Sequence, residues 1–400
     1  MDKLKVVITQ GHRWHYFQWF LLGFYRLQEQ GKIDFELKIP FVEKLPFFAC
    51  GDFMMRVGRK IQFEHGKDSY HMDGYVEDEE GKKHSFTVDC SDTPFMFDVK
   101  RLEDMDVYFK MQCPDDLSAD SFPLTHTIHI PWLDSEDDDC KYRRESERGQ
   151  RKVIEEFEKY RSKILPLMIG TRQLSRGDNH ATLEAAYDNY TKNYRENKEK
   201  KGMCYFGNAK GPKTVNSITV DNADFGSERD INSAYKGKIS HPNEKRAVIS
   251  DYLEQMGDTY DARLISRENS DSGVINNNHM IVPLEDFCKH ISKFEYNFNV
   301  SGYTLSIPNR FIESFIVGTG IVTDKLHVRW YLPFDEAEVI ETVEMGYEKN
   351  DDVDWDTFFD QVKNLPDGDP KRIHDCFMQK WEPSVVAQYM IDSVLAKGGQ

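Results

Sequence analysis

The sequence has no long apolar run and no excess of positive charge. No stretch approaches the roughly 18 consecutive apolar residues of a membrane-spanning helix, and the N-terminus lacks the apolar core of a signal peptide. The chain carries 52 lysines and arginines against 69 aspartates and glutamates, a net charge of −17, which argues against binding to nucleic acid. We therefore expect a cytoplasmic protein that binds no nucleic acid and makes at most peripheral contact with a membrane.

Paired cysteines are also absent. The seven cysteines are scattered singly, without a CxxC pair, so neither a disulfide framework nor a zinc site is expected. The histidines show no metal-ligand spacing, and the acidic run at 136–139 is typical of a solvent-exposed loop. We predict no metal site.

What the chain does contain is an α/β rhythm over 400 residues, a length that favours two domains. A strand at 5–9, an aromatic-rich helix at 16–30 and a strand at 35–39 form a βαβ opening. Two alternating runs flank the acidic turn 77–81 and predict a β-hairpin. Because this hairpin departs from the α/β rhythm, we interpret it as an insertion in the first domain.

The second half of the chain resumes the same rhythm after a polar boundary. A long helix is predicted from about residue 147 to 169, and a lysine-rich stretch at 189–201 is typical of a domain boundary. The pattern restarts with a strand at 202–207. We therefore predict one domain over residues 1–195 and another over 196–400.

The most informative segment is 293–324, which holds a strand, a turn, a helix and a second strand. Its first strand covers 294–300, and the helix is predicted from Pro308 with an apolar stripe that stops at Gly318. The second strand covers 321–324. The turn between the first strand and the helix consists of Ser301, Gly302 and Tyr303.

This arrangement suits a phosphate, because a helix that follows a glycine turn presents free N–H groups and a partial positive charge. Arg310 lies in the first turn, and Glu313 lies on the same helical face, where its carboxylate could accept hydrogen bonds from a sugar diol. The alternative is an ordinary surface pair between Arg310 and Glu313. Asn309, Gly207 and Lys210 complete our candidates for nucleotide binding, although Lys210 equally suits a plain surface loop.

The segment resembles the donor-nucleotide signature of glycosyltransferases with the two-domain GT-B fold, and most of all the exostosin-like branch. The shared features are the glycine turn, Arg310, Glu313, the small-residue turn at 318–320 and the downstream pair Pro333-Phe334. The family's glycine turn is often richer in glycine, and here Gly302 alone supplies it.

The resemblance implies an α/β fold of two Rossmann-like domains facing across a cleft, with the last helix crossing back to the first domain. It implies a metal-independent, inverting transfer of a sugar from a nucleoside diphosphate donor to a glycan or lipid-linked acceptor, as in polysaccharide biosynthesis. No cofactor is needed beyond the nucleotide-sugar. Arg310 would hold the diphosphate, Glu313 the ribose, and residues 301–303 the phosphates or the base.

Inverting transfer also needs a base that removes the proton of the acceptor hydroxyl, and two first-domain loops compete for this role. His12 and His15 follow the first strand, at the end where α/β sheets keep their sites, and Asp92 follows the hairpin. We rank Asp92 ahead because a carboxylate suits the resembled family better. The alternatives are histidines that cap and pack under the aromatic helix and an Asp92 that only forms a turn before Pro94.

Two other functions stay open from the sequence. A nucleotide-sugar epimerase on the same fold would convert its substrate without an acceptor. A catalytically silent glycan-binding or scaffold protein would bind no nucleoside diphosphate.

Overall fold

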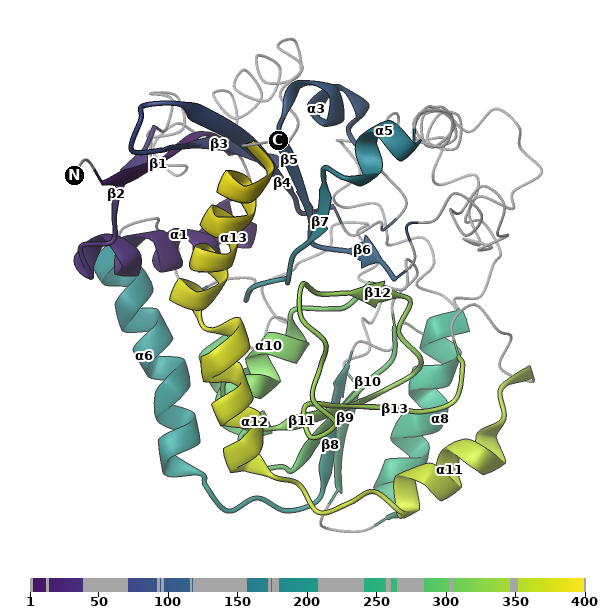
Figure 1. Cartoon of the computed structure of the whole chain (residues 1–400). Coiled ribbons are helices and arrows are strands. Elements are labelled where there is room, and N and C mark those ends of the chain that lie inside the picture. The colour runs from purple at the N-terminus through teal and green to yellow at the C-terminus, as the bar shows by residue number, and fades with distance from the viewer. Residues whose placement is uncertain are drawn as a thin grey trace, which may run out of the picture.

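Two β-sheets and the helices around them form the protein, with the first sheet at the top of Figure 1 and the second below it. A two-stranded ribbon lies between them. The structure is a computed structural model that describes residues 3–11, 14–38, 71–91, 94, 97–115, 117, 157–171, 174, 180–207, 241–256, 260–264, 284–301, 306–345 and 352–398.

The first sheet has the strand order β2-β1-β3-β4-β5-β7, and β3 alone of these runs antiparallel to its neighbours. The predicted βαβ opening is confirmed, since β1 and β2 pair in parallel on either side of α1 (Trp14–Glu29) in the chain. The strands are β1 (Leu4–Gly11), β2 (Ile33–Leu37), β3 (His71–Glu77), β4 (Lys83–Asp89), β5 (Val107–Lys110) and β7 (Ile164–Pro166).

The hairpin of β3 and β4 exists as predicted, but its interpretation as an insertion is wrong. β3 pairs with β1 and β4 pairs with β5, so the hairpin forms the middle of the first sheet. Alternate residues such as Met72 and Val88 pack into the core with α1 and the last helix. The exposed acidic turn at its tip suggested an outlying hairpin, whereas its two strands are largely buried.

The long helix predicted at 147–169 is wrong at its C-terminal end. Helix α5 (Phe157–Arg161) ends before β7, which pairs with β5 at the edge of the sheet. Pro166 suits such an edge, because no further strand among those described needs its missing N–H. Residues 147–156 lie outside the described part of the chain.

The second sheet is entirely parallel, with the order β13-β11-β10-β8-β9. If the described strands are numbered along the chain and the sheet is read from β9, this is the doubly wound order 2-1-3-4-5. The direction of winding reverses between β8 and β10. The strands are β8 (Met203–Gly207), β9 (Tyr260–Leu264), β10 (Tyr296–Asn299), β11 (Gly320–Thr323) and β13 (Val339–Glu341).

Helices cover both faces of this sheet. Apolar residues of α8 (His241–Gln255) and α11 (Trp355–Lys363) pack with Tyr205 and Phe298 on one face. Those of α9 (Leu284–Ile291) and α10 (Arg310–Phe315) pack with Cys204 and Ile321, whose side chains point to the other face. The two helices that follow β8 and β10 therefore leave the sheet on opposite sides.

The predicted strand–turn–helix–strand segment is confirmed as β10, α10 and β11, with β10 and β11 paired in parallel. Its helix is shorter than predicted and begins at Arg310. The apolar stripe is fully buried, and Gly318 closes the helix at φ 67°, a conformation that favours glycine. Its members are Phe311, Ile312, Phe315 and Ile316.

The C-terminal helices run from the second sheet to the first (Figure 1). After α12 (Pro370–Cys376) and the π-helical turn η6 (Phe377–Trp381), helix α13 (Pro383–Gly398) packs on α1. Tyr389 of α13 donates a hydrogen bond to the carbonyl of Pro166 at 3.0 Å. The predicted boundary stretch 189–201 is helical in part, within α6 (His180–Glu196), and the division into two domains stays a prediction.

Contacts join the carboxyl edges of the two sheets. β6 (Cys113–Pro114), just after β5, pairs with β12 (Val328–Arg329), just after β11. The side-chain amide of Gln112 bonds both the N–H and the carbonyl of Ile307. The loops that leave β10 and β11 therefore lie against the loop that leaves β5. In the residues that the structure describes, we find no helix with the length and apolar character needed to cross a membrane.

Gly23 of α1 tests the packing of α13. A Cβ at this position would lie 2.1 Å from the carbonyl oxygen of Pro383 and 2.8 Å from the Cβ of Ala387. Helix propensity alone would favour alanine by about 1 kcal/mol. We expect Gly23→Ala instead to lower the free energy of unfolding by about 1–3 kcal/mol, since the backbone of α13 must move away. Urea denaturation measures this, with the exposed helix residue Lys192→Ala as the control, and a variant as stable as the wild type would contradict the packing.

Candidate functional site

The strand order of the second sheet reverses between β8 and β10. Because α8 and α10 leave on opposite faces, they stand apart at the carboxyl edge of the sheet. Doubly wound sheets bind their ligands in the crevice outside the strand ends at such a point. This edge is therefore the first place to look for a site.

Two arginines approach this edge, one from each helix. Arg246 of α8 donates a hydrogen bond to the carbonyl of Val300, directly after β10, at 3.4 Å. Arg310 begins α10, and its Nη1 is buried without a hydrogen-bond partner in the part of the chain described. Burial lowers the pKa of Arg310, and the charge of Arg246 lowers it further, against the opposing effect of Tyr205 and Glu313. Two like charges that lie close together favour the binding of an anion between them.

Tyr205 of β8 lies with the arginines. Its side chain is fully buried, and its hydroxyl lies close enough to the guanidinium of Arg310 for a hydrogen bond between them to influence both groups. Burial raises the pKa of Tyr205, while the charges of Arg246 and Arg310 act in the opposite direction and that of Asp324 adds to the rise. The raised pKa keeps the hydroxyl neutral, so it can accept a hydrogen bond from Arg310 and still donate its own hydrogen to a ligand.

Asp324, directly after β11, fixes the start of the glycine turn. Its Oδ1 accepts hydrogen bonds from the N–H and the hydroxyl of Ser301, both at 2.9 Å, and from the hydroxyl of Thr323 at 3.1 Å. Burial raises the pKa of Asp324, and these hydrogen bonds together with the charge of Lys245 oppose the rise. Ser301, predicted to contact phosphate or base, thus directs its hydroxyl to Asp324.

The other predicted nucleotide-binding residues have separate places. Glu313 is only 7% exposed and the Nη1 of Arg310 is buried, so the two residues do not form an exposed surface pair, although the charge of Glu313 acts on Arg310. Asn309 donates a hydrogen bond to the carbonyl of Gly170 at 2.5 Å, which ties the start of α10 to the chain after β7. Gly207 ends β8 at the carboxyl edge. Gly302, Tyr303 and Lys210 lie outside the described residues.

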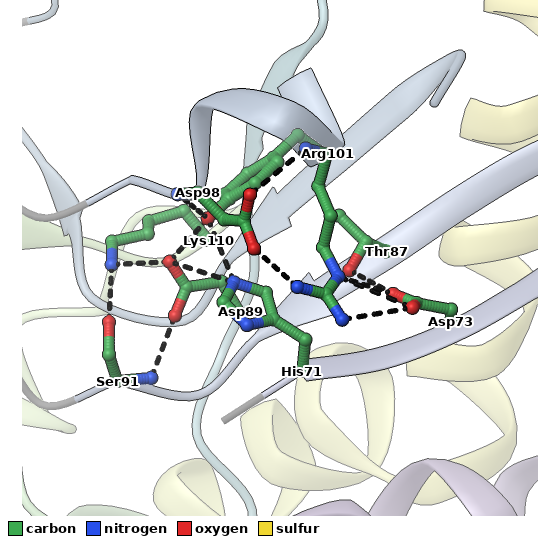
Figure 2. Close-up of polar contacts among 9 residues, drawn as sticks. His71, Asp73, Thr87, Asp89, Ser91, Asp98, Arg101 and Lys110 are labelled. Atoms are coloured by element: carbon green, nitrogen blue, oxygen red, sulfur yellow. Dashed lines mark hydrogen bonds and ion pairs between the residues drawn. The ribbon is translucent and has the colours of Figure 1, made fainter. Parts of the chain in front are cut away.

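A second polar group lies at the carboxyl edge of the first sheet (Figure 2). His71, Asp89 and Lys110 stand opposite one another on β3, β4 and β5, and so share one face of the sheet. Lys110 is 0% and Asp89 1% exposed, and the Nζ of Lys110 lies 2.7 Å from the Oδ2 of Asp89. We call these three residues, together with Tyr108, the first-sheet ladder.

Every oxygen of the central carboxylate is engaged. The Oδ2 of Asp89 also accepts the hydroxyl of Tyr108 at 2.7 Å, and its Oδ1 accepts the N–H of Ser91 at 2.8 Å. Burial alone would raise the pKa of Asp89, but the charges of Lys110 and His71 and the hydrogen bonds from Lys110 and Tyr108 hold it below its usual value. The ladder is thus a balanced ion-pair network.

The ladder leads directly into the loop that carries a predicted base. Lys110 donates a hydrogen bond to the hydroxyl of Ser91 at 2.8 Å, so Ser91 is held twice, immediately before Asp92. Asp92 and His12 lie outside the described residues, and His15 belongs to α1 with its side chain outside the description. Which of the three acts as base stays a prediction.

Sequence reasoning missed Arg246, Tyr205, Asp324 and the ladder. The ladder left a signal, because polar residues alternate with apolar ones on both strands of the hairpin, an unusual pattern for buried strands. Asp324 left a weaker one as the acidic residue that ends a buried strand. For Arg246, one charged residue among several in α8, we find no such signal.

A third group of titratable residues lies away from both edges. One ligand atom each of Glu29, His180 and Glu184 falls within 4.8 Å of the others, as metal ligands would. Arg26, however, donates hydrogen bonds to both oxygens of Glu184, at 2.6 and 2.7 Å. The group is therefore better described as an ion-pair network than as a metal site.

Comparison of the chain with protein-family models and with curated proteins gives no match. The function must therefore be argued from the site and from the resemblance of the segment 293–334.

The first-sheet ladder predicts a pH-dependent loss of stability. Lys110→Met would leave Asp89 buried without its cation, and we expect the free energy of unfolding at pH 7 to fall by about 3–5 kcal/mol. In the wild type, the pKa of Asp89 is lower in the folded protein than in the unfolded chain, where it is about 3.9. Asp89 therefore stabilises the fold at pH values above about 3.9, and this contribution is lost as the pH falls through the pKa of the folded state.

In the variant, the charge and the hydrogen bond of Lys110 no longer oppose burial, although His71 and Tyr108 still do, and the pKa of Asp89 rises. The loss of stability should therefore shrink as the pH is lowered from 7 towards 4. Urea denaturation at several pH values measures it. Lys371→Met, which breaks an exposed pair with Asp375, is the control and should leave stability unchanged. A deficit that is small at pH 7 or independent of pH would contradict the role of the pair.

Proposed function

We propose that the protein is a GT-B-type glycosyltransferase that moves a sugar from a nucleoside diphosphate donor to a glycan or lipid-linked acceptor. One observation carries this proposal. Arg246 and Arg310 converge at the switch point of a doubly wound sheet, and a buried nitrogen of Arg310 has no partner in the described residues. The Nη1 of Arg310 needs a hydrogen-bond acceptor, which the phosphate oxygens of a ligand would supply.

A diphosphate meets this need better than a single carboxylate does. Guanidinium groups bind phosphate oxygens through two parallel hydrogen bonds, and two arginines on separate helices can hold two phosphate groups. In sugar transfer the diphosphate is also the leaving group, so the same arginines would stabilise the charge that develops as the glycosidic bond breaks. Tyr205 adds a neutral donor, and Glu313 is the candidate for the ribose.

The arrangement of the two sheets supports transfer between two bound substrates. Gln112, Asn309 and the β6–β12 ribbon join the carboxyl edge of the first sheet to that of the second. In the GT-B fold the donor and acceptor edges face each other, as two Rossmann-like domains across a cleft, here residues 1–195 and 196–400. The base would come from the first edge, with Asp92 ahead of His15 and His12.

Donor binding tests the proposal. Titration calorimetry with UDP, GDP, CDP and ADP identifies the nucleoside diphosphate that binds most tightly. We expect Arg310→Gln and Arg246→Gln each to weaken its binding about 10- to 100-fold, because each removes a charged hydrogen bond worth about 1.5–3 kcal/mol. The affinity of Arg310→Lys for the nucleotide should lie between those of the wild type and Arg310→Gln, since lysine keeps the charge and loses the two parallel hydrogen bonds.

Arg372 provides the control, as an exposed arginine on α12 that pairs with Asp335 and Glu336. Arg372→Gln should bind the nucleotide like the wild type. Unchanged affinity in both Arg310→Gln and Arg246→Gln would show that the diphosphate does not bind here.

A further inference from the structure

Asp324 is unevenly engaged. Its Oδ1 accepts three hydrogen bonds, from the N–H and hydroxyl of Ser301 and from the hydroxyl of Thr323. Its Oδ2 is buried and accepts no hydrogen bond from the residues described. The residue is only 1% exposed. A buried carboxylate oxygen without a partner costs free energy, so it points to a group that the free protein lacks.

The surroundings of Asp324 belong to the arginine site. Ser301, which Asp324 holds by two hydrogen bonds, directly follows Val300, whose carbonyl accepts the hydrogen bond from Arg246. The charge of Asp324 also acts on Tyr205, as do the charges of Arg246 and Arg310. The charge of Lys245 on α8 acts on Asp324, and its Nζ donates a hydrogen bond to the carbonyl of Met345. The site thus contains two arginines that attract an anion and one carboxylate that repels it.

These two features select different parts of one ligand. A carboxylate repels phosphate and accepts hydrogen bonds from O–H and N–H groups. Asp324 can therefore contact only a part of the ligand that bears a hydrogen-bond donor and no negative charge, such as a sugar hydroxyl. Because Oδ1 is occupied, a single oxygen remains, which suits one hydroxyl rather than two adjacent donors that would need both oxygens.

We propose that the site binds a hydroxylated phosphate ester, and that the Oδ2 of Asp324 accepts a hydrogen bond from one hydroxyl of the sugar in that ester. The hydroxyl belongs either to the ribose of the nucleotide or to the transferred sugar. This inference rests on the proposed function and adds a residue that determines specificity for the same site. Arg246 and Arg310 hold the phosphates, and Asp324 distinguishes a nucleotide from free diphosphate.

The test is Asp324→Asn, which keeps an oxygen for Ser301 and Thr323 but removes the charge and replaces Oδ2 with a donor. Calorimetry compares inorganic diphosphate, the tightest-binding nucleoside diphosphate and its glucose ester. We expect diphosphate to bind the variant at least as tightly as the wild type, because a repelling charge is gone. A ribose contact predicts a loss of about tenfold or more for both nucleotides, and a contact with the transferred sugar predicts that loss for the ester alone.

Deoxy analogues test the same contact without changing the fold. On the wild type, the analogue that lacks the contacted hydroxyl should bind about tenfold more weakly, and on Asp324→Asn it should lose nothing further. Thermal unfolding of the variant shows whether it is folded.

Three results would overturn the inference. They are an equal loss for all three ligands in Asp324→Asn, no loss for any of them, and a wild type that binds nucleotides no better than diphosphate. The first two leave the proposed function intact if Arg310→Gln weakens nucleotide binding as expected. The third result, a wild type that binds nucleotides no better than diphosphate, would contradict both the inference and the proposed function.

Discussion

The site depends on how the loop before Arg310 is held. Gln112 accepts the N–H of Ile307 at 3.0 Å and donates to its carbonyl at 2.9 Å, and both residues are buried. A side-chain amide that bonds both backbone groups of one residue fixes that residue's position as a neighbouring strand would. Asn309 adds a bond to Gly170, two residues further on. The position of Arg310 is therefore set by the first sheet as much as by its own.

The two polar groups differ in how completely they are satisfied. In the first-sheet ladder, both oxygens of the central carboxylate of Asp89 are engaged, by Lys110, Tyr108 and Ser91. At the second edge, Arg310 and Asp324 each keep a buried atom without a partner among the described residues. Since native proteins rarely leave such atoms unpaired, the second edge is the better candidate for a binding site.

Local features of the fold were predictable from the sequence, and long-range ones were not. The segment of β10, α10 and β11 was predicted because its strands, turn and helix each depend on neighbouring residues. The central place of the hairpin depends on which strands pair, and the meeting of Arg246 with Arg310 depends on the reversal of strand order between β8 and β10. Asp92, His12 and His15 remain predicted bases, and Arg310 is the candidate that sequence and structure share.

A crystal structure with the bound nucleoside diphosphate tests the central claim most directly. The account predicts that the diphosphate lies between α8 and α10, with phosphate oxygens about 2.7–3.0 Å from the guanidinium groups of both Arg246 and Arg310. A diphosphate bound at the edge of the first sheet, or one that contacts neither arginine, would contradict it.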